Sequence, residues 1–250
     1  MTKLTIVMPC YNEGERIYRN VIETLTQVEK FCDSFRLIVV NDGSSDESEA
    51  EINRAMQHDS RVGLISYTPN RGKGYAVRRG MLAAKSDFVA FLDADLELPP
   101  HLLKDFLEAS EGKSGSDERE EEGYDIVIGS KMHPDSQVEY PALRKIMSMG
   151  YYWFLKIIFG LKLKDTQTGI KLFKTEAIKP VLKLMRTGSF SFDIEMLAIA
   201  SKMNLKIKEM PVVVNFSRNK DNKSKISFSS IYEMVRDTLR IKMYVSKLKV

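Results

Sequence analysis

Short apolar runs alternate along the chain with stretches in which apolar residues recur at helical spacing. Four runs, Leu4–Pro9, Phe35–Val40, Val62–Tyr67 and Asp87–Ala94, are typical of buried strands. After the first of them, Ile17, Val21, Leu25 and Val28 recur at helical spacing. Strands that alternate with helices predict an α/β fold, with a parallel sheet and helices on both faces.

The second half of the chain is less regular. Asp125–Lys131 and Ile207–Phe216 are predicted to contain further strands, and the apolar segment Leu143–Gly160 is predicted to be a helix that is part core and part hydrophobic surface. No window has the ~20 uninterrupted apolar residues of a membrane span, and no basic-then-apolar signal is seen near the first residue, so neither feature is expected. We expect one domain over residues 1–226, followed by a helix over residues 227–250.

The C-terminal helix combines an apolar face with many cations. The apolar positions at helical spacing are Ile231, Met234, Val235, Thr238, Ile241, Val245 and Leu248. Lys242 and Lys249 fall close to this face, where a bilayer surface tolerates them better than a protein core does. The pattern therefore favours a membrane-surface helix. From Ser201 onward the chain has 12 Lys and Arg and 4 Asp and Glu, a net charge of +8, although the whole chain carries only +4. This charge indicates an anionic partner: nucleic acid, phosphate groups or a membrane surface.

Four polar clusters, "PCYNEG", "NDGSSD", "NRGKG" and "DADLE", each follow one of the first four strands. Ligands of parallel α/β sheets bind outside the carboxyl ends of the strands, so we expect these clusters to meet at one edge. Asp93, Asp95 and Glu97 offer hard oxygen ligands that suit Mg²⁺ or Mn²⁺. The lysine of "NRGKG" is typical of a phosphate contact, although the segment matches neither the dinucleotide fingerprint nor a Walker A loop. Cys10 and Cys32 form no metal spacing and are expected to be free, buried thiols in a reducing compartment.

The order of "VMPCYNEGERI", "VVNDGSSDES", "NRGKGYAVRRG", "FLDADLELPP", "GSK", "DTQTGIKLF" and "SFDIEML" resembles the family 2 glycosyltransferases. Within that family, the chain is most similar to the dolichyl- and polyprenyl-phosphate glucosyl- and mannosyltransferases, from Leu4 to about Ile226. The resemblance implies the GT-A fold, with a Rossmann-like, mostly parallel sheet flanked by helices. It also implies inverting transfer of a hexose from UDP-glucose, a similar UDP-sugar or GDP-mannose to a polyprenyl or dolichyl phosphate. The lipid-linked sugar would serve glycan or glycoprotein synthesis, and the enzyme would be peripheral on the cytoplasmic membrane face.

The resemblance also implies roles for individual residues. Donor binding is expected of Pro9, Tyr11, Asn12, Glu13, Asp42, Gly72, Lys73, Gly74, Asp93, Ala94, Asp95, Gln167 and Thr168. The divalent cation, Mg²⁺ or Mn²⁺, would be held by Asp93, Asp95 and Glu97. The acceptor phosphate would be bound by Lys131, Arg218, Ser224 and Lys225. Asp95, Lys131, Arg218, Lys225, Asp193 and Glu195 are the candidate catalytic residues. Two positions depart from the family pattern: Glu97, where many mannosyl members carry Gln, and Lys131, which stands in the usual place of an Arg.

Two other functions remain open at this point. A family 2 enzyme with a hydroxyl acceptor would need Asp193 or Glu195 as a general base, whereas a phosphate acceptor has no proton to lose. A catalytically silent protein that binds nucleotide sugars or nucleic acid is the other alternative. Intact metal-binding carboxylates argue against silence, and the few aromatic residues among the cations of "SRNKDNKSKIS" argue against nucleic acid.

Overall fold

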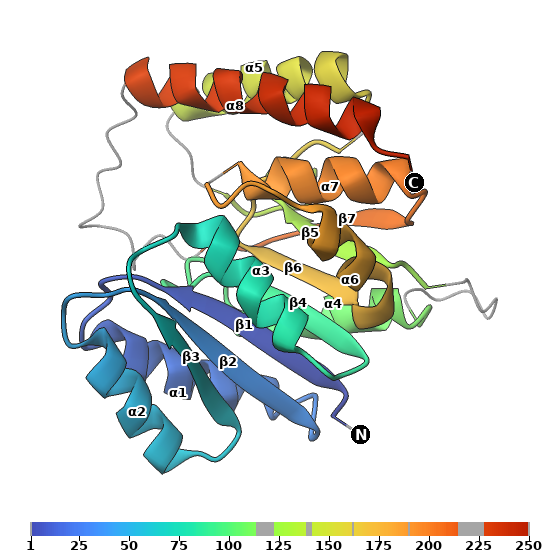
Figure 1. The fold of residues 1–250 in the computed structure, drawn as a ribbon. Helices are drawn as coiled ribbons and strands as arrows, with labels where there is room; N and C mark the ends of the chain where they lie inside the picture. Colours follow the sequence, from blue (N-terminus) through green and yellow to red (C-terminus); the bar gives the residue numbers. More distant parts are fainter. Residues whose placement is uncertain are drawn as a thin grey trace.

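The computed structural model of the protein describes residues 2–113, 123–138, 142–161, 163–189, 191–214 and 228–249, without the side chains of residues 142–148 and 228–234. These residues form a seven-stranded sheet with helices on both faces (Figure 1). The strand order is β3-β2-β1-β4-β6-β5-β7. All paired neighbours are parallel except β6, which is antiparallel to both β4 and β5. The predicted α/β fold with a mostly parallel sheet is confirmed.

The strands are short and mostly buried. Their bounds are β1 Leu4–Cys10, β2 Phe35–Asp42, β3 Val62–Tyr67, β4 Phe88–Leu92, β5 Ile126–Ser130, β6 Ile170–Lys174 and β7 Ile207–Pro211. The sequence pattern predicted each of them except β6. Strand β6 has lysines at its second and fifth positions, and, unlike β7, it is not followed by an apolar run such as Val212–Val214.

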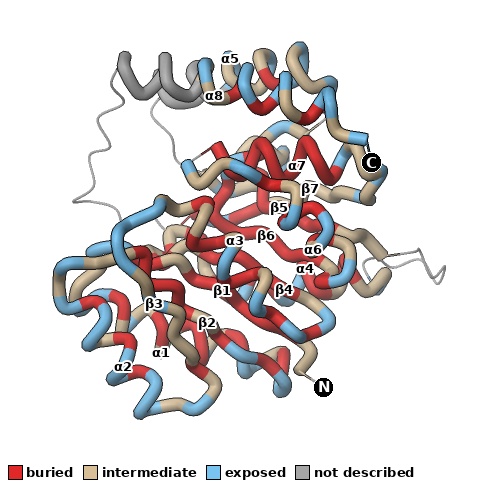
Figure 2. The backbone as a smooth tube through the Cα atoms, viewed as in Figure 1, coloured by how far each residue is buried: buried red, intermediate tan, exposed pale blue. Residues whose placement is uncertain are grey.

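The helices divide into two groups that cover opposite faces of the sheet. Their bounds are α1 Arg16–Val28, α2 Ser48–His58, α3 Lys73–Ala83, the 3-10 helix η1 Pro100–Leu102, α4 Leu103–Ser110, α5 Ala142–Phe159, α6 Thr175–Leu184, α7 Phe192–Lys202 and α8 Phe228–Lys247. One core contains the apolar side chains of α1, α2 and α4, and the other contains those of α3, α6 and α7. Side-chain alternation along β1 feeds both cores: Leu4, Ile6 and Met8 enter the first and Val7 enters the second. Figure 2 shows that the burial is concentrated in the sheet and the inner faces of these helices.

Helices α5 and α8 lie beyond α7, on the side of the molecule away from β3 (Figure 1). On α8, Thr238, Ile241 and Val245 are buried, and the Tyr244 hydroxyl donates a 2.7 Å hydrogen bond to the Leu184 carbonyl. Lys202 of α7 donates to the Val245 carbonyl at 2.7 Å, which satisfies an acceptor at the end of α8. This part of the predicted apolar face therefore packs against protein. None of the helices in the described part of the chain is long and apolar enough to cross a membrane.

Candidate active site

The loops that follow β1 and β2 are joined by hydrogen bonds at the carboxyl edge of the sheet. The backbone N–H of Asn12 donates to Ser44 Oγ at 3.0 Å, and its side-chain Oδ1 accepts from the N–H of Ser45 at 2.9 Å. The N–H of Glu13 donates to Ser48 Oγ at 2.9 Å. Asn12 has a φ of 53°, in the left-handed region that asparagine tolerates better than most residues. The predicted meeting of the first two polar clusters is confirmed.

Asp42 attaches the "NRGKG" loop to the end of β2. Its carboxylate accepts hydrogen bonds from the N–H of Arg71 at 2.8 Å, the N–H of Gly72 at 2.9 Å and the side-chain amide of Asn70 at 3.0 Å. The residue is only 3% exposed. The carboxylate of Asp42 therefore anchors the loop, and its predicted contact with the donor stays a prediction.

The glycines of that loop allow a close approach of other parts of the protein backbone and side chains. Gly72 has a φ of 91°, and a Cβ there would meet the carbonyl oxygen of Gly188. A Cβ on Gly74 would meet the side chain of Phe192, and the N–H of Gly74 donates to the Gly188 carbonyl at 3.0 Å. The start of α3 is therefore packed closely against the segment that leads into α7.

Three lysine–carboxylate pairs occupy the middle of this edge. Lys73 Nζ lies 2.7 Å from Asp93, Lys131 Nζ lies 2.6 Å from Glu97, and Lys171 Nζ lies 2.7 Å from Asp193. Burial opposes the charged ammonium of Lys73, but the carboxylates of Asp93 and Asp193 raise its pKa. Strands and loops distant in sequence thus bring cations and carboxylates together in a largely desolvated site.

Asp93 and Asp95 suit a divalent cation. Burial raises the pKa of Asp95, and the negative charge of Asp93 raises it further. A bound cation would relieve the repulsion between these two carboxylates. Asp95 also accepts the N–H of Glu97 at 3.0 Å. Within the described ranges no three Asp, Glu, His or Cys side chains are grouped closely enough to hold a metal by themselves. A cation at Asp93 and Asp95 would therefore take further ligands from a bound diphosphate, as Mg²⁺ commonly does. The metal-binding role of these residues and of Glu97 stays a prediction.

Asp193 and Glu195 both lie in the first turn of α7 but contact different groups. Asp193 is 4% exposed, and burial raises its pKa although Lys171 and Lys73 act against that shift. Glu195 accepts the backbone N–H of Thr187 at 2.9 Å and that of Arg186 at 3.1 Å, so it supports the loop between α6 and α7. The two predicted catalytic carboxylates are both engaged with protein groups.

The remaining predicted donor residues surround the cluster. Pro9 lies in the last part of β1, and Tyr11 is 51% exposed at the rim. The carbonyl of Ala94 accepts from the side chain of Asn20 at 2.7 Å. Gln167 is exposed, whereas Thr168 is 1% exposed.

Two residues of the cluster were not predicted from sequence. Lys171 is fully buried and donates to the Thr168 carbonyl at 2.6 Å. The carbonyl of Gly169 accepts the N–H of Asp93 at 2.9 Å. The signal in the sequence that could have found Lys171 was a lysine between two apolar residues, Ile170 and Leu172. The predicted phosphate ligands Arg218, Ser224 and Lys225 lie outside the described residues.

Comparison with known proteins identifies the family. The chain matches "Glycosyl transferase family 2" over residues 5–182. It is 30% identical to the dolichyl-phosphate beta-glucosyltransferase of Dictyostelium discoideum, over 96% of this chain and 73% of that protein. It is 28% identical to the dolichyl-phosphate beta-glucosyltransferase of Saccharomyces cerevisiae, over 96% of this chain and 74% of that protein.

Solved structures show the same fold. Glucosyl-3-phosphoglycerate synthase from Mycobacterium tuberculosis, in complex with Mn²⁺, UDP and glucosyl-3-phosphoglycerate, superposes with a TM-score of 0.66 at 18% identity, over 100% of this chain and 81% of that chain. The edge described above is built on a GT-A sheet, and the sequence match extends over most of the chain. This protein therefore belongs to the family 2 glycosyltransferases.

Proposed function

We propose that this glycosyltransferase transfers glucose from UDP-glucose to a polyprenyl phosphate of the dolichyl type, with inversion at the anomeric carbon. Relatives at about 30% identity over most of the chain are named dolichyl-phosphate beta-glucosyltransferases. The observation that carries the choice of acceptor is the state of Asp193 and Glu195. The first is ion-paired with Lys171 and the second is bound to backbone amides, so neither is placed as a free base.

A phosphate acceptor suits this arrangement because it needs no base. Its anionic oxygen attacks C1 of glucose, the bond from C1 to the diphosphate breaks, and UDP leaves with the bonding electrons. No proton has to be removed from the nucleophile. The acceptor needs cations that bring it in line with C1, and we assign this role to Lys131, Arg218 and Lys225, with Ser224 as a hydroxyl donor to the phosphate. A hydroxyl acceptor would instead need a carboxylate that is free to accept its proton.

The donor is held at the loops after β1, β2 and β4. In this proposal Tyr11, Asn12 and Glu13 contact the nucleotide, and Lys73 approaches the diphosphate from the start of α3. A divalent cation, Mg²⁺ or Mn²⁺, bound by Asp93 and Asp95 with Glu97 beside them, would act as a Lewis acid toward the departing diphosphate. Mn²⁺ and UDP in the superposed synthase complex support a metal-dependent reaction.

An organic-phase transfer assay tests the reaction. The protein is incubated with Mg²⁺ or Mn²⁺, a short-chain polyprenyl phosphate and a panel of radiolabelled UDP- and GDP-sugars, and label is followed into the organic phase. We expect label from UDP-glucose, and a loss of ~10²-fold or more in Asp95→Ala. Asp87→Ala, at the opposite end of β4 and exposed, is the matched control. UDP release that responds to a saccharide hydroxyl, with no label in the organic phase, would replace this proposal with the hydroxyl-acceptor reaction.

A polyprenyl phosphate acceptor resides in a membrane, so the protein needs a surface that can contact lipid. The outer surface of α5 and α8 has the properties of such a surface. Met149, Trp153 and Ile157 recur every four residues on α5 and are 43%, 52% and 78% exposed. Leu239 and Met243 of α8 are also exposed, at 43% and 59%. Apolar side chains that recur at i, i+4 and i+8 form one stripe along a helix. This stripe is an exposed apolar surface of the kind that marks an interaction site.

Cations lie directly beside the stripe. The ammonium of Lys156 lies 4.7 Å from the ring centre of Trp153, and that of Lys242 lies 5.7 Å from the ring centre of Phe159. Lysines beside aromatic rings can reach headgroup phosphates while their stems cover apolar surface. The proposal therefore places this surface against an anionic membrane. Cytoplasmic leaflets carry anionic lipids, so it assigns the protein to that face as a peripheral enzyme.

Flotation with liposomes tests the membrane contact. Wild-type protein should float with vesicles of phosphatidylglycerol and phosphatidylcholine, and the Trp153→Ser/Ile157→Ser variant should bind about tenfold more weakly because two apolar side chains are lost. Met56→Ser removes a side chain that is 37% exposed on α2, far from α5, and should leave flotation unchanged. Equal flotation of all three proteins would contradict the assignment of this surface.

A further inference from the structure

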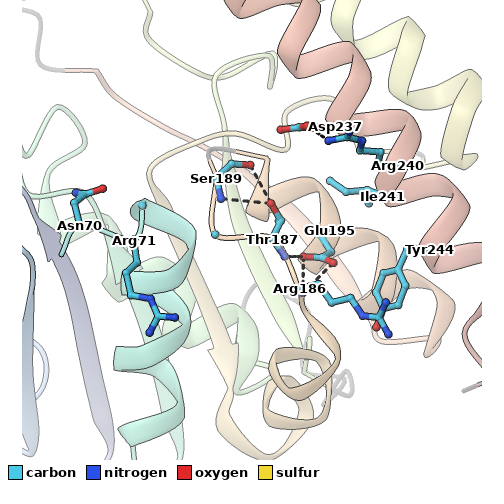
Figure 3. Close-up of a pocket in the computed structure, with 12 residues that line it drawn as sticks. Asn70, Arg71, Arg186, Thr187, Ser189, Glu195, Asp237, Arg240, Ile241 and Tyr244 are labelled. Atoms are coloured by element: carbon cyan, nitrogen blue, oxygen red, sulfur yellow. Dashed lines mark hydrogen bonds and ion pairs between the residues drawn. The ribbon is translucent and has the colours of Figure 1, made fainter. Parts of the chain in front are cut away.

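A cavity of about 710 Å³ lies between the start of α3, the loop between α6 and α7, and α8 (Figure 3). Its walls are Asn70–Gly72 from the first of these, Arg186–Ser189 from the second, and four residues of α8: Asp237, Arg240, Ile241 and Tyr244. Lys73, Asp93 and Asp193 are not among the residues that line it. The cavity is therefore separate from the lysine–carboxylate cluster, although the "NRGKG" loop borders both.

Arginines supply most of the charge in this cavity. Arg71, Arg186 and Arg240 line it together with two carboxylates, Glu195 and Asp237. The Glu195 carboxylate is taken up by the backbone amides of the α6–α7 loop. Asp237 is partly buried and lies 3.5 Å from Arg236 and 3.9 Å from Arg240, so it compensates the charge of Arg240 only in part. The cavity thus carries more positive charge than its own carboxylates compensate.

Two of the guanidinium groups are stacked on aromatic rings. Arg71 lies 4.1 Å from the ring centre of Tyr75 and donates to its hydroxyl at 2.7 Å, and Arg186 lies 4.0 Å from the ring centre of Tyr244. Among the described residues, neither guanidinium has a carboxylate oxygen within ion-pair distance, although the charge of Arg186 acts against the rise that burial causes in the pKa of Glu195. Stacking fixes the plane of a guanidinium and leaves N–H groups at its edge for an oxyanion. Thr187 and Ser189 also line the cavity, and their hydroxyls lie 3.0 Å apart, so one of them donates to the other and the second can donate to a ligand.

We infer that this cavity binds a phosphate monoester between Arg71 on one wall and Arg186 with the loop hydroxyls on the opposite wall (Figure 3). Planar arginine forks match the oxygens of a phosphate and give the strongest class of hydrogen bond in proteins. Ile241 and the Tyr244 ring provide apolar wall beside these donors. Since α8 also belongs to the outer layer assigned to the membrane, the expected carrier of the phosphate is the lipid acceptor, held here before it reaches the donor. That choice of carrier rests on the proposed function, whereas the phosphate site itself does not.

Hydrogen exchange read by mass spectrometry locates the ligand without any transfer reaction. Full-length protein is exposed to citronellyl phosphate, a short water-soluble prenyl phosphate, to inorganic phosphate, or to uncharged citronellol, with no sugar donor present. Citronellyl phosphate should slow exchange of the amides of Arg186–Ser189. Arg186→Gln and, separately, Arg71→Gln should raise the concentration needed for half-maximal protection about tenfold. Arg79→Gln, an exposed arginine of α3 outside the cavity, should leave that concentration within about twofold, as expected for a surface change.

Each outcome has a definite meaning. Protection by citronellyl phosphate alone supports the site with the lipid as carrier, and equal protection by inorganic phosphate supports the site with free phosphate as its ligand. Protection by citronellol, no protection by either phosphate, or full protection in both arginine variants would overturn the inference. Because no donor is present, failure of glucose transfer in the organic-phase assay leaves this result unaffected.

Discussion

Replacement of Asp42 tests how the "NRGKG" loop is held at the carboxyl edge of the sheet, where the donor is proposed to bind. Replacement by alanine removes the acceptor for two backbone N–H groups, those of Arg71 and Gly72, and for the amide of Asn70. These groups are part-buried, so water replaces the lost acceptor incompletely. We expect the "NRGKG" loop to detach from the end of β2 and the folded state to lose stability.

The size of the effect follows from the three hydrogen bonds. A hydrogen bond to a charged group contributes ~1.5–3 kcal/mol, and the three share one carboxylate whose own desolvation cost is relieved by the substitution. A net loss of about 2–5 kcal/mol is therefore expected. For a chain of this size, 1 kcal/mol shifts the melting temperature by ~2–4 °C, so Asp42→Ala should melt about 4–20 °C below wild type. Asp42→Asn keeps one acceptor oxygen but places an amide NH₂ where the other oxygen stood, so it should recover less than half of this loss.

Thermal unfolding by circular dichroism, together with the KM for UDP-glucose, separates the two roles of Asp42. Loop anchoring predicts a lower melting temperature and a higher donor KM in the same variant. Asp33→Ala, at an exposed carboxylate before β2, is the matched control and should change neither quantity. An unchanged melting temperature in Asp42→Ala with a raised donor KM would refute the anchoring role and leave the contact with the nucleotide as the explanation.

Three further substitutions test the site and the core. Lys171→Met removes the cation paired with the buried Asp193 and should lower the free energy of unfolding, measured with urea, by ~3–5 kcal/mol. An unchanged free energy of unfolding would show that the pair is not buried in solution. Burial raises the pKa of the Cys10 thiol to about 12. In a Cys32→Ser variant, Cys10 should therefore react with a disulfide reagent at pH 8 only after the protein unfolds. Rapid reaction of the folded variant would contradict this expectation. Gly169→Ala places a methyl group against the Asp93 carboxylate and should lower kcat about tenfold or more with a small change in melting temperature, because misplaced catalytic groups lose rate steeply. Gly150→Ala, whose Cβ meets no atom within 4 Å, is its control, and equal kcat values would contradict the expectation.

The pattern of the sequence was sufficient to predict where the loops at the strand ends lie, but it was insufficient to predict strand β6 in the sheet. Parallel strands place their carboxyl ends at one edge, so the order of strands and polar clusters along the chain was enough to predict that the loops after β1, β2 and β4 meet. Strand β6 could not be found in this way, because Lys171 and Lys174 interrupt it and no apolar run follows it, whereas Val212–Val214 follow β7. The ammonium of Lys171 is paired with the carboxylate of Asp193, which lies in another element, and also donates to the Thr168 carbonyl. Pairing between distant residues is a property of the fold, and no local pattern encodes it.

The two acidic residues of "SFDIEML" show a second limit and a consequence for function. Successive residues of a helix are rotated by about 100°, so positions 193 and 195 point about 200° apart. One carboxylate therefore faces Lys171 and the donor edge, and the other faces the α6–α7 loop and the arginine-lined cavity. A single turn of α7 thus borders both places where phosphate is proposed to bind. Because the same loop packs against Gly72 and Gly74, a phosphate that tightens the loop would also fix the start of α3, from which Lys73 reaches Asp93. This turn of α7 is therefore the element through which the two proposed phosphate sites would be coupled.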